Sequence, residues 1–307
     1  MRRRRLRRIG LGIAVTIFLV VGAVGLVYRD QIVRYATHLK GSPKSTVLWE
    51  PFLPDGPPDL HLAVAGDVGD SGSRLDATAE AISQLNDRQP VDALLLLGDN
   101  AYPSGDPAEL RDTVFAPFGA LLDGGAELLA VLGNHDVKAG HAAGQVAALG
   151  MPGRWWARHE GEVLIVGLDS NRVHDPAQTA WLERTLAAST ERWRIVVLHH
   201  PPYSAGYQGS DHDVRLAFVP LFERYDVQLV LSGHDHDYQR SEPINGVTYV
   251  VTGGAAGTRR TGEDDFTAVS FSWHHFVEVA VFHDRLVIRA VNQDLRVADE
   301  AAIVPLS

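Results

Sequence analysis

Short apolar runs alternate with amphipathic stretches along most of the chain. The runs lie at residues 60–65, 93–97, 128–132, 162–168, 194–198 and 227–231. Runs of this length, bounded by turn-forming residues, are typical of strands buried on both faces of a parallel sheet. The stretches between them predict helices at 73–86, 107–122, 176–188 and 216–224. From residue 246 onward, strand-like alternation predicts antiparallel strands, so the pattern favours an α/β fold: a layered α/β/β/α sandwich of mixed sheets.

The first 58 residues follow a different pattern. Six arginines precede an uncharged, largely apolar run at 9–28, which is long enough to cross a bilayer with its N-terminus in the cytoplasm. We therefore predict a cytoplasmic Arg-rich segment and transmembrane signal anchor at 1–28, a Pro-rich linker at 29–58 and one folded domain at 59–307. The domain would lie outside the cell membrane. A signal peptide cleaved near Ala23 is the alternative, and it would make the protein secreted.

Composition narrows the chemistry. With 45% hydrophobic residues, the chain can bury a substantial core, and with no cysteine it has no disulfide and no thiolate metal ligand. Without the six N-terminal arginines, 22 basic side chains face 38 acidic ones, a net charge of −16. Such a charge repels nucleic acid, and an anionic substrate would need local positive charge. The charge therefore disfavours nucleic acid as a partner, and the anchor predicts the membrane as one.

Five predicted strands end in polar side chains that can bind metal. These residues are Asp67, Asp99, Asn134, His199 and His234. Because parallel strands place their carboxyl ends at one edge of a sheet, we expect the five to meet across a single crevice. Carboxylate and imidazole ligands suit zinc, iron or manganese better than calcium. His234 and His236 are two residues apart in an extended segment and would point in opposite directions, which suits two adjacent metals.

Other polar residues near these strand ends have less certain roles. Tyr102 can fold back beside Asp99, although a plain turn would explain that pair as well. We interpret four further residues as partners of the ligands or as surface groups: His200, Asp70, Asp136 and Asp235. Trp155 and Trp156 are interpreted as a packed lid.

The motifs GDVG, GDNAY, GNHD, VLHHPPYS and GHDHDY occur in this order from about residue 59 to the C-terminal part of the chain. Together they resemble the calcineurin-like metallophosphoesterases, specifically the purple acid phosphatase branch with its small tartrate-resistant form. The resemblance implies that Asp67, Tyr102 and His236 hold one metal. It implies that Asn134, His199 and His234 hold a second, with Asp99 bridging. Gly69 stands where most of the superfamily has a histidine ligand, and Tyr102 occupies the position of the replacement ligand in this branch.

The resemblance also implies the cofactors and the reaction. The implied cofactors are Fe(III) at the Tyr102 site and Fe(II), Zn or Mn at the second site. Asp99 and His135 are the predicted catalytic residues, with His135 protonating the leaving group, a role that typically contributes about 10²- to 10⁴-fold. The predicted substrate-binding residues are His135, Asn134 and, less directly, His212. The expected reaction is hydrolysis of phosphate monoesters, so the predicted partner is a small phosphorylated substrate. One alternative is a phosphodiesterase acting on nucleotides or lipid headgroups. The other is an inactive, membrane-tethered binding protein.

Overall fold

The computed structural model describes residues 46–52 and 56–305. The predicted anchor at 1–28 and most of the linker at 29–58 lie outside the described residues. Among the residues that are described, no helix is both long enough and apolar enough to cross a membrane.

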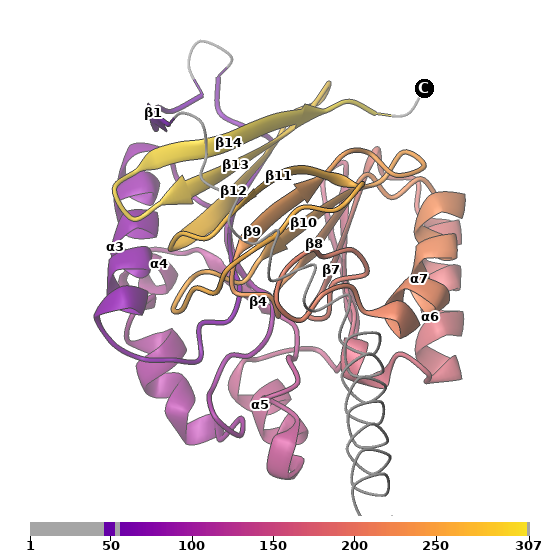
Figure 1. The fold of residues 1–307 in the computed structure, drawn as a ribbon, viewed down its shortest axis with the longest axis horizontal. Coiled ribbons are helices and arrows are strands. Elements are labelled where there is room, and N and C mark those ends of the chain that lie inside the picture. Colours follow the sequence, from indigo (N-terminus) through magenta and orange to yellow (C-terminus); the bar gives the residue numbers. More distant parts are fainter. Residues whose placement is uncertain (1–45, 53–55, 306–307) are drawn as a thin grey trace, which may run out of the picture.

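Two seven-stranded mixed sheets form the centre of the domain (Figure 1). The first sheet has the order β1-β14-β13-β12-β2-β3-β4 and the second has the order β11-β9-β10-β8-β7-β6-β5. The first comprises β1 (Val47–Leu48), β2 (Leu60–Ala65), β3 (Ala93–Leu96), β4 (Glu127–Ala130), β12 (His275–Val281), β13 (Leu286–Asn292) and β14 (Arg296–Ile303). The second comprises β5 (Trp156–Glu160), β6 (Val163–Gly167), β7 (Trp193–Leu198), β8 (Leu229–Ser232), β9 (Tyr238–Ser241), β10 (Thr248–Thr252) and β11 (Thr267–Phe271).

Parallel pairing occurs at one end of the first sheet, including its edge strand β4, and in the middle of the second sheet. In the first sheet β2, β3 and β4 are parallel to one another, and in the second β6, β7, β8 and β10 are parallel. The C-terminal strands β12, β13 and β14 add to the first sheet in antiparallel register. The predicted layered α/β fold with mixed sheets is confirmed.

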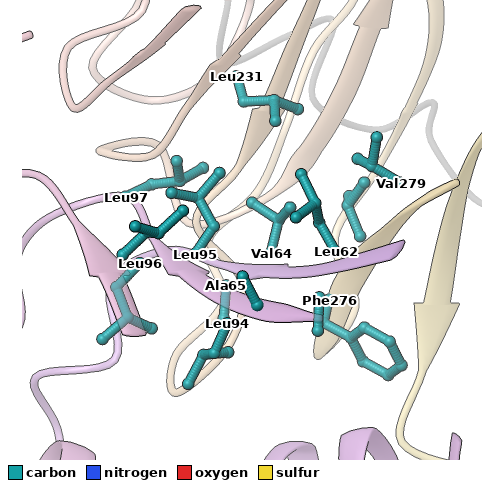
Figure 2. Close-up of a cluster of buried hydrophobic side chains, with 14 of the residues drawn as sticks. Leu62, Val64, Ala65, Leu94, Leu95, Leu96, Leu97, Leu231, Phe276 and Val279 are labelled. Carbon is teal, nitrogen blue, oxygen red and sulfur yellow. The ribbon is translucent and has the colours of Figure 1, made fainter. Parts of the chain in front are cut away.

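The apolar runs form strands because both of their faces are buried. In Figure 2, Leu62, Val64 and Leu95 point to the side on which Leu231 of the second sheet lies, whereas Leu94 points to the opposite side. All of these side chains are excluded from solvent. The facing sheets therefore share one hydrophobic core, and the outer face of each sheet needs a cover of its own.

Helices supply that cover. They are α3 (Ser73–Arg88), α4 (Gly119–Asp123), α5 (Ala142–Ala148), α6 (Pro176–Ala188) and α7 (His212–Arg224). In Figure 1, α3 and α4 lie on one side of the sandwich and α6 and α7 on the other. Leu182 and Leu186 of α6 and Phe218 and Phe222 of α7 pack with the outward-facing side chains of the second sheet, such as Val196. The order of layers is helix, sheet, sheet, helix.

Two predicted helices differ from the observed ones. The single helix predicted at 107–122 is a 3₁₀ turn (Pro107–Glu109), a π-helical turn (Arg111–Phe115) and the short α4. Pro117 lies between the last two, and a proline interrupts a helix because it has no N–H to donate. The helix predicted at 216–224 begins four residues earlier, at His212, where the side chain of Asp211 caps it by accepting the backbone N–H of Val214.

The predicted tryptophan lid is wrong in part. Trp156 begins strand β5, which the sequence pattern did not predict, and it is only 4% exposed. Its indole nitrogen donates to the carbonyl oxygen of Ala130 at the end of β4. Trp156 therefore joins the second sheet to the first, within the core.

Candidate metal centre

The polar strand ends come from two sheets rather than from one. Asp67, Asp99 and Asn134 follow β2, β3 and β4, whereas His199 and His234 follow β7 and β8. The expectation of one sheet edge is therefore wrong, because the apolar pattern does not indicate which sheet a strand joins. The two edges nevertheless face each other across a cavity of about 280 Å³. It is lined by Asp70, Asp99, Tyr102, Pro103, Asn134, His135, Gln208, His234, His236 and Arg259.

Two carboxylates lie at this site: Asp99 lines the cavity, and Asp67 contacts the lining residues Tyr102 and His236. Asp67 is fully buried and Asp99 is 2% exposed. The basic groups nearest to them are imidazoles: His236 Nε2 is 3.4 Å from Asp67 Oδ1, and His199 Nε2 is 3.5 Å from Asp99 Oδ1. Burial raises the pKa of Asp67 to about 6, although His236 opposes the shift. Two nearly inaccessible carboxylates this close together need a cation to neutralise them.

The backbone at these residues is unusual. Asp67, Asp99 and His234 have φ angles of 59°, 52° and 71°, although none of them is glycine. Each follows a glycine that has no room for a side chain; a Cβ at Gly98, for instance, would lie within 2.8 Å of the Cα of Gly133. Non-glycine residues with positive φ are uncommon and occur preferentially at functional sites. The turns force these three side chains into the cavity at some conformational cost.

His199 is oriented by the first sheet. Its Nδ1 lies 2.8 Å from the carbonyl oxygen of Leu97, which can only accept, so Nδ1 carries the proton. The lone pair of Nε2 then faces Asn134 Oδ1 at 3.1 Å and His234 Nδ1 at 3.2 Å. Burial, together with the neighbouring imidazoles, lowers the pKa of His199 well below its usual range and that of His234 to about 2. Neutral imidazoles held by a backbone carbonyl are typical of metal ligands.

Tyr102 lies on the other side of the cavity with Asp67 and His236. Its hydroxyl donates to Asp67 Oδ1 at 3.2 Å and is 3.1 Å from His236 Nε2. Burial and the negative charges of Asp67 and Asp99 raise the pKa of this phenol far above its usual range. A phenolate at this position therefore requires a strongly charged cation beside it.

His135 lies at the mouth of the cavity, and its side chain is 28% exposed. Its backbone N–H donates to Asp99 Oδ1 at 2.8 Å, and its Nδ1 is 2.7 Å from the carbonyl oxygen of Pro103. Its ring packs edge-on against Tyr102, with the centroids 4.6 Å apart. Lys138 Nζ lies 3.0 Å from Nδ1. The ring is therefore fixed beside the carboxylate pair while remaining accessible to a bound molecule.

The four residues interpreted as partners of the ligands have different positions. Asp136 is fully buried and accepts hydrogen bonds from the backbone nitrogens of Asn100, Ala101 and Gly133. Burial and the charge of Asp99 raise the pKa of Asp136 to about 8. Asp136 thus joins the turn after β3 to the turn after β4.

The other three lie around the second sheet and the rim. Asp235 is buried and accepts from the backbone nitrogens of Gln208 and Gly209. The ring of His200 is 4.6 Å from that of His234, and its Nδ1 lies 2.7 Å from Ser170 Oγ. Asp70 is exposed and lines the cavity.

His212 is exposed at the first position of α7 and is not among the side chains that line the cavity. Sequence reasoning missed two side chains that do line it, Gln208 and Arg259. Both lie in loops without apolar periodicity, so only the position of the loops beside the strand ends could have revealed them.

The donor set fits metal ions. Two groups of three residues bring their possible ligand atoms within 4.8 Å of one another. The first group is Asp67, Asp99 and His199, and the second is His199, His200 and His234. The two groups share His199, so they are adjacent in space. Carboxylate, amide and phenol oxygens with imidazole nitrogens suit iron, zinc or manganese. A dinuclear metal site is also what the family identified below provides.

Comparison with known proteins identifies the family. The family model "Calcineurin-like phosphoesterase" matches residues 60–238, which include every one of the predicted metal ligands. Tartrate-resistant acid phosphatase type 5 of Oryctolagus cuniculus is 27% identical over 249 residues, which cover 68% of this chain and 76% of that protein.

Two solved structures share the fold. "GAP50 the anchor in the inner membrane complex of Plasmodium" has a TM-score of 0.72 at 18% identity, covering 81% of this chain and 89% of that one. Purple acid phosphatase PPD1 from yellow lupin, Lupinus luteus, has a TM-score of 0.68 at 19% identity over 80% of this chain. The match spans about half of the lupin chain, 53% of its length. The family model covers more than half of the present chain, which therefore belongs to the calcineurin-like phosphoesterase family and has acid phosphatases among its relatives.

Proposed function

We propose that the protein hydrolyses phosphate monoesters with two metal ions held in this cavity. The observation that carries the proposal is the convergence of two buried carboxylates from the first sheet with imidazoles from the second sheet, beside an accessible His135. Acid phosphatases among the relatives support the same reaction class. Two bound metals would activate a water molecule and stabilise the negative charge on the phosphoryl oxygens.

The proposed ligands divide into two groups. Asp67, Tyr102 and His236 already contact one another within 3.4 Å and would hold the first metal. Asn134, His199 and His234 form a second contacting group, with distances of 3.1 and 3.2 Å. Asp99, whose Oδ1 is 3.5 Å from His199 Nε2, would bridge the two. The phenol of Tyr102 favours Fe(III) in the first position; Fe(II), Zn or Mn is proposed for the second.

The chain's own side chains have two further tasks in this reaction. The Nε2 atom of His135 would donate a proton to the departing alcohol oxygen, because Nδ1 is occupied by the Pro103 carbonyl. Asn134 and His135 would also contact the phosphate, since both line the cavity. Asp99 accepts the backbone N–H of His135 and thereby sets the distance between the imidazole and the bound phosphate.

The test combines metal content, colour and turnover. The full-length protein is purified, its iron, zinc and manganese are counted per chain, and its visible spectrum is recorded beside the hydrolysis of 4-nitrophenyl phosphate. We expect two metals, a purple or pink colour and turnover. Tyr102→Phe is expected to lose the colour, and Tyr207→Phe, which alters an exposed tyrosine, serves as the control. Two metals without hydrolysis of this monoester or of bis(4-nitrophenyl) phosphate would contradict the proposal and favour a binding protein.

We further propose that residues 1–28 anchor the protein in the cell membrane, with the domain on the outer side. The support is the arginine cluster followed by a 20-residue uncharged run. Protease added to intact cells should remove the domain, and carbonate extraction should leave the protein in the membrane fraction. Release of a shortened chain into the medium would instead favour cleavage of a signal peptide.

A further inference from the structure

Two loops form one side of the cavity, and each contributes a lining side chain that is not among the predicted site residues. Gln208 belongs to the loop before α7, and Arg259 to the loop after β10. The backbone N–H of Gln208 donates to Asp235 Oδ1 at 2.6 Å, and that of Arg259 donates to the carbonyl oxygen of His236 at 2.7 Å. Both loops are therefore attached to the segment that carries the two C-terminal histidines of the site, and their backbones keep a fixed relation to it.

Arg259 is a cation without an acidic partner in the part of the chain that is described. Its guanidinium carbon lies 5.5 Å from the centre of the Tyr207 ring, and it forms no ion pair with a described carboxylate. Tyr207 is 66% exposed, so the two side chains stand together at the surface. Arg259 is also the one arginine or lysine among the residues that line the cavity.

Arg259 lies in negatively charged surroundings. The chain as a whole has a net charge of −10, and Asp70 and Asp99 also line the cavity. An arginine in such surroundings would be expected to form a salt bridge, yet the ring of Tyr207 holds it in an open position. A guanidinium whose N–H groups have no acceptor among the described residues, beside the proposed phosphate site, is suited to a second anion, and the amide of Gln208 offers further donors.

We propose that Arg259, assisted by Gln208, forms an anion subsite that binds a negatively charged group on the organic part of the substrate. The preferred substrates are then phosphate monoesters that carry a second anionic group. This inference rests on the proposed function, because it places the scissile phosphate beside His135 and the second anion toward Arg259. The metals and Lys138 would attract the scissile phosphate beside His135, whereas Arg259 is the basic side chain that lines the cavity on the side of the second anion and would determine which monoesters bind well.

The test uses two substrates of nearly the same shape. They are 4-carboxyphenyl phosphate, which has the second charge, and 4-carbamoylphenyl phosphate, which lacks it. The metal-loaded full-length protein is assayed with both at one ionic strength. We expect wild type to favour the carboxylate, and Arg259→Gln to lower that preference, measured as the ratio of the two kcat/KM values, by about 10-fold or more. The loss should appear mainly in KM for the carboxylate.

Two variants separate a contact from general charge. Arg260→Gln removes the same charge from the next residue, which does not line the cavity, and should keep the preference. Arg259→Lys keeps the positive charge but lacks the planar guanidinium group, and it should keep part of the preference for the carboxylate substrate. An equal loss of kcat/KM on both substrates in Arg259→Gln, or an equal change of preference in Arg260→Gln, would overturn the subsite while leaving the phosphatase proposal standing. Failure of metal-loaded wild type to hydrolyse either ester would overturn both.

Discussion

The backbone N–H of His234 donates to Oδ2 of Asp67 at 2.8 Å, and this bond crosses from the second sheet to the first. Asp67 follows β2 and His234 follows β8, so neither sheet contains the site alone. A second link, from His199 to the carbonyl oxygen of Leu97, crosses in the same direction. The proposed metal centre thus depends on how the two sheets are positioned against each other.

Asp99→Ala should remove both metals and nearly all activity. Asp99 is 2% exposed and lies next to His199 and His135, so its loss would remove the proposed bridge and the acceptor for the His135 N–H. Residues that only support ligands typically change metal affinity or activity by about 10- to 100-fold, so a bridging ligand should cost more than about 100-fold. Elemental analysis per chain checks this. Asp70→Ala, which alters an exposed lining carboxylate, is the control and should keep both metals.

His135→Ala should keep both metals and lower turnover by about 10²- to 10⁴-fold. The imidazole contributes a proton donor to the proposed reaction but is not a proposed ligand. The effect should be larger for an alkyl phosphate than for 4-nitrophenyl phosphate, because a nitrophenolate needs little protonation to leave. Turnover equal to that of wild type on the alkyl ester would show that His135 is not the general acid.

Asp136→Ala should destabilise the fold without removing a ligand. Its carboxylate accepts the backbone N–H groups of Asn100, Ala101 and Gly133, and each buried N–H that loses its acceptor costs about 1–3 kcal/mol. Denaturant unfolding of the metal-free variant should show a loss of more than about 3 kcal/mol. Asp136→Asn keeps one acceptor oxygen and should lose less. Equal free energies of unfolding in wild type and Asp136→Ala would refute this role.

His275 should make the fold less stable in acid. It lies buried in β12, with Nε2 3.0 Å from Thr252 Oγ1, and burial lowers its pKa from 6.5 to about 4. The unfolded chain therefore takes up the proton first. The contribution of neutral His275 is complete above pH 6.5 and is lost as the pH falls from 6.5 to 4, about 3 kcal/mol in all.

The measurement for His275 is the difference in free energy of unfolding between pH 7 and pH 5. His275→Gln keeps a polar group near Thr252 but has no proton to gain in this range, so its free energy should fall less between the two pH values. Parallel pH dependence in wild type and variant would mean that other groups dominate the acid response.

The sequence predicted the part of the site that lies directly behind strands. Asp67, Asp99 and Asn134 could be identified because each follows a buried apolar run within a few residues, and burial on both faces leaves a strong pattern. The same pattern could not show that His199 belongs to a different sheet from Asp99, since strands in both sheets have the same apolar runs. Sheet membership depends on long-range pairing, which a local pattern does not contain.

Loops were predicted least well, for a related reason. Gln208 and Arg259 reach the cavity because their backbones are bonded to the segment around His236, and neither bond has a signature in the sequence. The interpretation of Trp156 as part of a lid has the same origin, because a tryptophan pair in a glycine-rich stretch without apolar periodicity gives no sign of a strand. Its burial becomes apparent only when β5 is seen to pair with β6.

The division of the proposed ligands between two sheets also bears on how a chain without cysteine is held together. Small secreted domains commonly use disulfides, and this chain has none. Ions bound by Asp67 and Asn134 from one sheet and by His199 and His236 from the other would act as non-covalent cross-links. Metal binding and packing of the two sheets would then be thermodynamically linked. An ion whose free concentration is 100 times its dissociation constant would raise the free energy of unfolding by about 2.7 kcal/mol. In this protein the proposed catalytic centre would also stabilise the packing of the two sheets.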